Sequence, residues 1–280
     1  MSAVRPGAQA AGRTDTGPLP LVLLHALPLD ASMWDETARR LRARDHHVIA
    51  LDQRGFGTMP LPDEPPSLDL VADDLARELD RRGIDSVALA GCSMGGYVAL
   101  SFLRRHPGRV RALALLAARA TADTPQAAGA RLRFADLILD DSLRDRVVAE
   151  TTPSLLGATT RAGRRRLLAE VTDVARAARP HSIAWAQRAI AARADATAVL
   201  HATDVPAVVV IGEEDELVTL AEARETSAAL PRGRLVTLPE VGHLAPLEAP
   251  ETTVEILTDL LTRAEKAGSA GVPAEGASAC

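Results

Sequence analysis

The amino-acid sequence predicts an α/β fold in which a doubly wound, mostly parallel sheet carries an all-helical insertion. Helix-like segments alternate with short, almost continuously apolar runs, which are typical of parallel strands covered on both faces. The runs are PLVLLH (20–25), HVIALD (47–52), SVALAG (86–91), RALALLA (111–117), VPAVVVIG (205–212) and RLVTLP (234–239). Strand–helix alternation of this kind indicates a doubly wound parallel sheet with right-handed crossovers.

The helices between these runs are marked by their end signals. Ser67 is a suitable N-cap for a helix with one apolar face, and Gly83 suits its C-terminal end. A second helix begins at Met94 and stops at His106-Pro107, because proline cannot continue a helix.

The alternation fails between about residues 120 and 200, where the chain is almost wholly helix-like. We interpret this insertion as a cap over the carboxyl edge of the sheet, the edge at which open α/β sheets bind ligands. The segment carries twelve arginines from Arg131 to Arg193, interleaved with acidic residues. Most of these arginines are expected on solvated helix faces, and the sequence leaves open which of them face a pocket.

The predicted organisation is therefore a core of residues 18–119 and 201–264, a helical cap of residues 120–200, and two tails. Residues 1–17 and 265–280 are small and polar without periodicity, so we expect both to be disordered.

Composition excludes several classes of function. A net charge of −5 does not favour nucleic acid or an anionic membrane as partner. There is no apolar run of membrane-spanning length and no apolar segment typical of a signal peptide near the start. Cys92 and Cys280 are the two cysteines, which does not suggest a disulfide framework. We expect a soluble cytoplasmic protein, and no residue spacing indicates a metal or organic cofactor.

The most specific motif is Gly91-Cys92-Ser93-Met94-Gly95, a G-x-S-x-G between an apolar strand and a helix. A nucleophile elbow needs this sharp turn, because it lifts the serine hydroxyl above the sheet. Glycines two residues to either side keep side chains out of the crowded turn. Ser93 is the predicted nucleophile, and Cys92 is expected to be a buried structural residue.

An acid and a base follow in the chain order that this architecture requires. Asp215 follows the strand that ends at Gly212, and His243 lies in the loop after the next strand. Glu213 and Glu214 compete with Asp215, but we place them toward solvent or beside the turn, because the loop needs a few residues to turn inward. Of the seven histidines, His243 alone lies in a loop at the correct end of a strand.

An oxyanion hole is predicted from the main-chain N–H groups of Leu27 and Met94. Leu27 follows the first strand in Leu24-His25-Ala26-Leu27-Pro28, and Met94 follows the nucleophile. His25 is expected to organise this loop through hydrogen bonds rather than to take part in chemistry.

The chain resembles the α/β-hydrolase superfamily, and within it the branch of 3-oxoadipate enol-lactonases, esterases and cofactor-free haloperoxidases. The resemblance covers about residues 20–262 and rests on LLHALPLDASMWD (23–35), DQRGFG (52–57), GCSMGGYVAL (91–100), GEEDELV (212–218) and GHLAPLEAPE (242–251). It implies the same roles for Ser93, Asp215 and His243, with Leu27 and Met94 as oxyanion donors, and a structural role for Asp52 to Gly57. Ala26 stands where the family commonly has glycine, and the antiparallel strands that usually open the sheet are not evident.

We therefore expect a hydrolase for a small-molecule ester or lactone, with no nucleic-acid or membrane partner and with homo-oligomerisation left open. The same three residues also support perhydrolysis, thioester or C–C bond hydrolysis, or a lyase or cyclase step, and the fold does not choose among these. A non-catalytic binding protein on the same scaffold is a third reading. It is disfavoured because all three residues are present in order.

Overall fold

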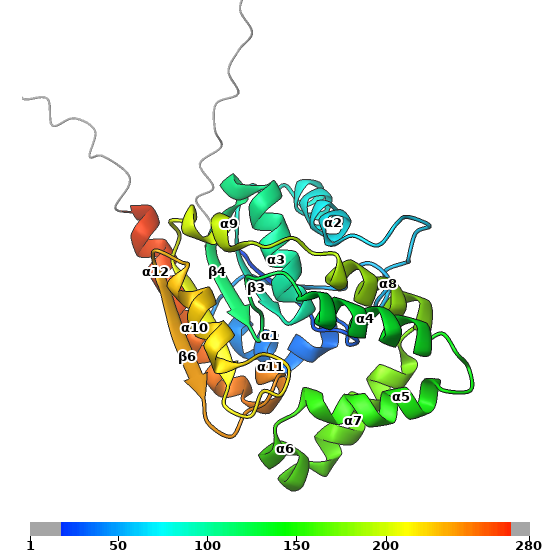
Figure 1. Cartoon of the computed structure of the whole chain (residues 1–280). Coiled ribbons are helices and arrows are strands. Elements are labelled where there is room, and N and C mark those ends of the chain that lie inside the picture. The colour runs from blue at the N-terminus through cyan, green and yellow to red at the C-terminus, as the bar shows by residue number, and fades with distance from the viewer. Residues whose placement is uncertain (1–17, 270–280) are drawn as a thin grey trace, which may run out of the picture.

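A computed structural model describes residues 18–269 and shows six parallel strands with helices on both faces (Figure 1). The strands are β1 (Leu21–Leu24), β2 (Val48–Leu51), β3 (Val87–Cys92), β4 (Val110–Leu116), β5 (Ala207–Gly212) and β6 (Gly233–Leu238). The first and last residues of each strand fall within two residues of the ends of the apolar run that predicted it. The predicted fold class is confirmed.

The strand order is β2-β1-β3-β4-β5-β6, with every neighbouring pair parallel. The chain goes from β1 outward to β2, then returns past β1 to β3 and proceeds in the other direction. The order therefore reverses between β1 and β3, and loops at such a reversal diverge and leave room for a ligand. The loop that contains Leu27 and the turn that contains Ser93 both start at this point.

Alternate side chains of each strand pack into two separate cores. Val22 and Leu24 of β1 join one core, and Leu21 and Leu23 join the other. The first core lies under α2 (Leu68–Arg81), α3 (Met94–Arg105) and α10 (Leu220–Ala228); the second lies under α1 (Asp35–Arg42) and α12 (Pro250–Ser269). A short helix, α11 (Ala245–Glu248), precedes α12.

The helix ends follow the predicted signals. Ser67 is the N-cap of α2 and accepts a hydrogen bond from the N–H of Asp69, while Gly83 adopts a left-handed φ of 68° just past the helix end. Helix α3 begins at Met94 and ends before Pro107.

The segment between β4 and β5 contains helices joined by loops, and no strand. Its helices are α4 (Pro125–Leu137), α5 (Arg144–Thr151), α6 (Ala158–Gly163), α7 (Arg165–Ala177), α8 (Pro180–Ala191) and α9 (Thr197–His201). Helices α4 and α8 pack together, α5 contacts α7, and both pairs lie on the same side of the core (Figure 1). The expected cap boundary at residue 200 falls inside α9, which contacts α3 of the core.

Two expectations concern the ends of the described chain. Helix α12 continues to Ser269, so residues 265–269 extend a helix and the predicted start of the tail at 265 is too early. The apolar face of α12 packs on the sheet, and the helix continues past this face into the polar residues that follow, because each added residue extends the existing ladder of helical hydrogen bonds. The rest of both predicted tails lies outside the described residues. Within 18–269 no strand precedes β1.

Candidate active site

The turn after β3 has the geometry of a nucleophile elbow. Ser93 has φ 52° and ψ −114°, a conformation that side-chain-bearing residues rarely adopt and that persists only where the surroundings enforce it. Its N–H donates to the carbonyl of Leu116 at 2.8 Å, which ties the turn to β4. A Cβ on Gly91 would lie 2.2 Å from the carbonyl oxygen of Gly95, and one on Gly95 would lie 2.2 Å from that of Leu24. The two glycines are therefore required by close backbone approach, as predicted.

His243 is held by Asp215 from the next loop. Its Nδ1 lies 2.9 Å from Oδ2 and 3.0 Å from Oδ1 of Asp215, and both side chains are at most 2% exposed. A carboxylate accepts hydrogen bonds, so Nδ1 carries the proton and Nε2 is left as the acceptor. Oδ1 of Asp215 also accepts the N–H groups of Leu217 and Val218, which fix its orientation.

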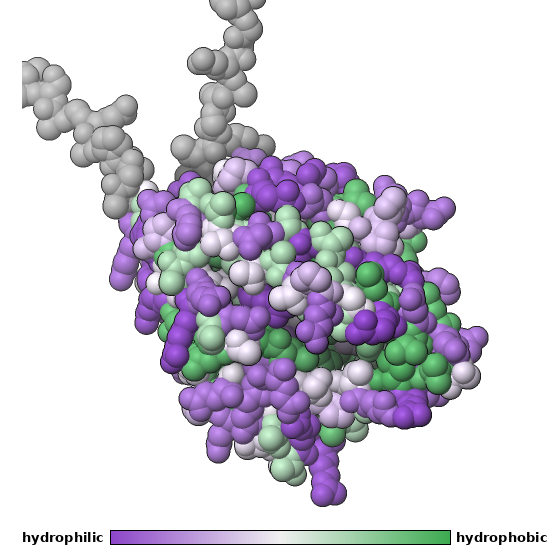
Figure 2. Space-filling view, in the orientation of Figure 1, coloured by the Kyte–Doolittle hydropathy of each residue, from purple (hydrophilic) through white to green (hydrophobic). Residues whose placement is uncertain are grey.

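Ser93 and His243 line one cavity of about 440 Å³, together with Leu27 of the predicted oxyanion loop. Most of the other lining residues are apolar, and α4, α5, α7 and α8 each contribute at least one of the lining residues. The face shown in Figure 2 is hollowed between the regions of α4 and α7, and apolar residues border the hollow. The helical segment thus roofs the cavity. The remaining six histidines, at positions 25, 46, 47, 106, 181 and 201, do not line it.

The loop after β1 is organised by His25. The N–H of Gln53 donates to Nε2 of His25 at 3.0 Å, so Nδ1–H donates to the carbonyl of Ala26 at 3.0 Å. Complete burial lowers the pKa of His25 to about 4, which keeps the ring neutral near pH 7. Ala26 is also fully buried, and its N–H contacts Sδ of Met33, so its methyl group fits the core. Within 18–269 neither Leu27 N–H nor Met94 N–H has a protein acceptor; Leu27 lines the cavity, whereas Met94 is not among its lining residues.

Two predicted structural roles agree with the contacts. Burial raises the pKa of the Cys92 thiol, whose Sγ lies 3.6 Å from the carbonyl oxygen of His243, so this thiol stays protonated and inert. Asp52 accepts hydrogen bonds from Ala31 and Thr58, which close the turn that it begins.

The sequence missed two carboxylates that join the roof to the loops beneath it. Glu213 is exposed as predicted, but Glu214 accepts from both the N–H and the hydroxyl of Thr159 in α6, at 2.8 and 2.6 Å. These bonds lower the pKa of Glu214. The sequence placed Glu214 toward solvent or beside the turn and did not indicate this contact with the roof, because the partner lies 55 residues away in the chain.

Glu248 is the second missed carboxylate, and it is 9% exposed. It accepts N–H groups from Gly242 and Leu244 at 3.1 Å, on either side of His243, and from Gly157 of the roof at 2.8 Å. One buried anion therefore holds the histidine loop and the roof together. In the sequence, the only feature that could have pointed to Glu248 was its position five residues after His243, and this position does not identify its hydrogen-bond partners.

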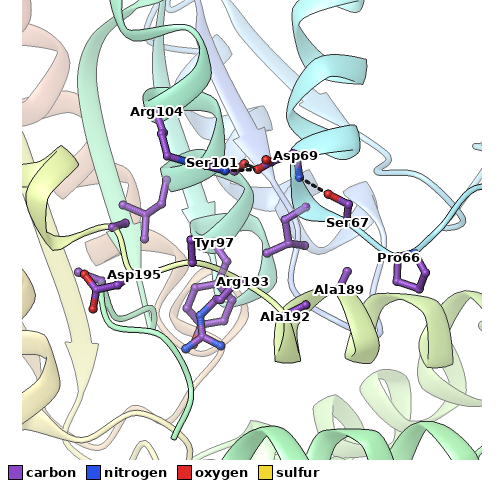
Figure 3. Close-up of a pocket in the computed structure, with 15 residues that line it drawn as sticks. Pro66, Ser67, Asp69, Tyr97, Ser101, Arg104, Ala189, Ala192, Arg193 and Asp195 are labelled. Atoms are coloured by element: carbon purple, nitrogen blue, oxygen red, sulfur yellow. Dashed lines mark hydrogen bonds and ion pairs between the residues drawn. The ribbon is translucent and has the colours of Figure 1, made fainter.

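A second, smaller cavity of about 200 Å³ lies beside the first (Figure 3). Tyr97 of α3 lines both cavities and forms part of the partition between them. The guanidinium of Arg193 lies over the Tyr97 ring, 4.2 Å from its centroid. The stacked pair gives the partition a fixed position.

No group of three or more potential metal ligands occurs among the described residues. No helix within the same range is long and apolar enough to cross a membrane.

Comparisons with known proteins agree with this geometry. Residues 20–250 match the family model described as alpha/beta hydrolase fold. The chain is 30% identical over 257 residues to a putative carbamate hydrolase, RutD, of Variovorax paradoxus, which covers 91% of this chain and 94% of that protein.

Solved structures give the same result. A thermophilic esterase from Thermogutta terrifontis has a TM-score of 0.83 at 30% identity, covering 88% of this chain and 90% of that one. The enol-lactonase of Burkholderia xenovorans LB400 has a TM-score of 0.79 at 26% identity, covering 90% and 94%. The resemblance inferred from the sequence is confirmed, and the chain belongs to the α/β-hydrolase fold family.

Proposed function

We propose that this protein is a serine hydrolase that cleaves a carboxylic ester or lactone of a small molecule through an acyl-enzyme intermediate. The observation that carries the proposal is the shared cavity. A strained serine and a histidine whose Nδ1 is held by a buried carboxylate both line it. This arrangement leaves Nε2 of His243 available to the Ser93 hydroxyl as a general base.

The reaction follows from the positions of these groups. Ser93 Oγ attacks the carbonyl carbon, and His243 takes its proton and returns it to the departing alkoxide. The free N–H groups of Leu27 and Met94 stabilise the negative oxygen of the tetrahedral intermediate. Water, deprotonated by the same histidine, then releases the acid. Asp215 orients His243 and stabilises its cationic form in both halves of the reaction.

The lining of the cavity favours a small organic substrate. Aliphatic side chains and Phe134 provide most of the surface, which suits an acyl chain and excludes bulk water from the acyl-enzyme. The relatives include an esterase and an enol-lactonase, which supports an ester or lactone substrate, and also a putative carbamate hydrolase, which is why carbamates belong in the test below.

The test pairs a covalent probe with a substrate panel. A fluorophosphonate should label the wild-type protein once, at Ser93, and should not label Ser93→Ala. Ser93→Ala should also lose at least about 10⁴-fold in kcat on an activated ester. The panel contains esters, lactones, thioesters, carbamates and β-diketones of matched size. Labelling of the mutant would refute the nucleophile, and preferential turnover of a thioester, carbamate or β-diketone would replace the proposed substrate class.

A further inference from the structure

The smaller cavity leads from the protein surface toward the cavity of Ser93. Exposed residues line its outer part, among them Arg104 and Asp195, and buried residues line its inner part, among them Leu100 and Tyr97 (Figure 3). Of the described residues, Tyr97 alone lines both cavities, and it is 4% exposed. A path from the surface to the candidate nucleophile is therefore closed at one aromatic ring.

Helix geometry places this ring beside the nucleophile. Tyr97 follows Ser93 by four residues, and its N–H donates to the carbonyl of Ser93 at 3.1 Å. Residues four apart in a helix lie on the same face, one turn from each other. The Tyr97 side chain thus lies on the face of α3 that carries Ser93, and it forms the cavity wall on that face.

Arg193 fixes the ring from the side of the smaller cavity. Its guanidinium lies 4.2 Å from the ring centroid, and its side chain is 6% exposed. The guanidinium donates to the carbonyl groups of Thr121 and Ile190, at 2.9 and 3.1 Å. Its charge is met within the protein, because Nη1 lies 2.8 Å from Oδ1 of Asp123 and the carboxylate of Asp195 also interacts with it. The stacked ring therefore rests against an arginine that is anchored on several sides.

The inner part of the smaller cavity suits an alkyl chain. The buried apolar residues that line it are Leu68, Leu100, Ala120, Ala189 and Ala196. The polar groups lie nearer the surface, where Ser101 and Arg104 both bond to Asp69 (Figure 3). The cavity has about 200 Å³ beside the 440 Å³ of the Ser93 cavity, so removal of the ring would enlarge the space open to a substrate by a large fraction.

We propose that the ring of Tyr97 sets the length limit of the substrate, as the end wall at which an ester chain stops. This rests on the proposed function and adds to it a specificity-determining residue that belongs to the core rather than to the helical roof. The reason is steric. A chain that passes the ring must displace Tyr97 together with the guanidinium stacked on it, so longer esters are excluded although apolar space lies beyond.

The test uses two series of esters. 4-Nitrophenyl alkanoates from acetate to dodecanoate vary the acyl chain, and n-alkyl acetates of the same lengths vary the alcohol. For the wild-type protein, kcat/KM should rise with chain length and then fall in the series whose chain lies against Tyr97. Tyr97→Ala should move this limit to longer chains. The gain over wild type should be about fourfold in kcat/KM for each methylene that enters the smaller cavity, the effect of burying one methylene.

Three further variants separate the ring from other effects of the substitution. Tyr97→Phe keeps the ring and its stacking on Arg193, so it should keep the wild-type length limit. Ala189→Leu added to Tyr97→Ala refills the smaller cavity and should return the limit toward that of wild type. Ala189→Leu alone is the matched control, because Ala189 does not line the Ser93 cavity, and it should not move the limit. Thermal melting checks that each variant folds.

A covalent readout does not depend on turnover. Alkyl fluorophosphonates of the same chain lengths should label Ser93 with rates that follow the length limits of the esters, and long reagents should gain in Tyr97→Ala. An unchanged limit in both ester series would overturn the proposal, because the chain would then stop elsewhere. A shift that Ala189→Leu fails to reverse would overturn it too, because loosening of α3 would then explain the shift. Absence of Ser93 labelling together with absence of turnover refutes the proposed function instead.

Discussion

Replacing Asp215 by asparagine tests which carboxylate orients His243. In the protein Oδ1 of Asp215 accepts two main-chain N–H groups, at 2.8 and 3.0 Å, and both of its oxygens lie within 3.0 Å of Nδ1 of His243. An asparagine keeps the two main-chain bonds by placing its oxygen at the Oδ1 position. Its amide nitrogen then takes the Oδ2 position, where it can only donate.

That donor requires Nδ1 of His243 to be an acceptor, which moves the ring proton to Nε2. The histidine can then no longer take the proton of Ser93, and the charge that stabilised its cationic form is also lost. We expect kcat to fall by about 10³- to 10⁴-fold, or roughly 4 to 5 kcal/mol of barrier, with the fold intact.

The neighbouring glutamates supply the matched controls, measured on the same activated ester. Glu213→Gln changes an exposed side chain, and Glu214→Gln keeps an oxygen for the Thr159 N–H and an amide N–H for its hydroxyl. Each should change kcat by less than about tenfold. A crippled Glu214→Gln beside a nearly normal Asp215→Asn would show that the orienting acid has been assigned to the wrong residue.

Two further predictions concern the loops around the site. Glu248→Gln places an amide N–H against one of three main-chain N–H donors, so it should lower the free energy of unfolding by about 1–3 kcal/mol and kcat by about tenfold or more. The control, Glu251→Gln on an exposed position of α12, should change neither quantity. Equal effects of the two substitutions would contradict the role of Glu248. His25 has a folded pKa of about 4, below its unfolded value of 6.5, so the stability from its neutral form is present above pH 6.5 and is lost as the pH falls toward 4. Between pH 7.5 and 5 this loss amounts to about 2 kcal/mol in denaturant titrations, and the same step should be smaller by that amount in His25→Gln.

The sequence by itself determined the architecture, because the signals for it are local. Apolar runs without alternation indicate strands covered on both faces, and Ser67, Gly83 and Pro107 mark helix ends through their own backbone chemistry. The turn at Ser93 is local in the same sense, since Gly91 and Gly95 meet within a few residues of each other. Asp215 and His243 could also be placed, because the ends of parallel strands meet at one edge of the sheet.

Only the tertiary structure decided which charges meet across the cavity. Glu214 and Glu248 bind main-chain groups of the roof that are 55 and 91 residues away, and no local pattern encodes such a partner. Arg131 was one of twelve arginines in a segment with the composition of solvated helix faces. Its place on the cavity wall depends on how α4 packs against α8 and on the burial of Asp123 between three segments. Which arginines share Asp123 depends on how these segments pack, and the order of the residues in the sequence does not show it.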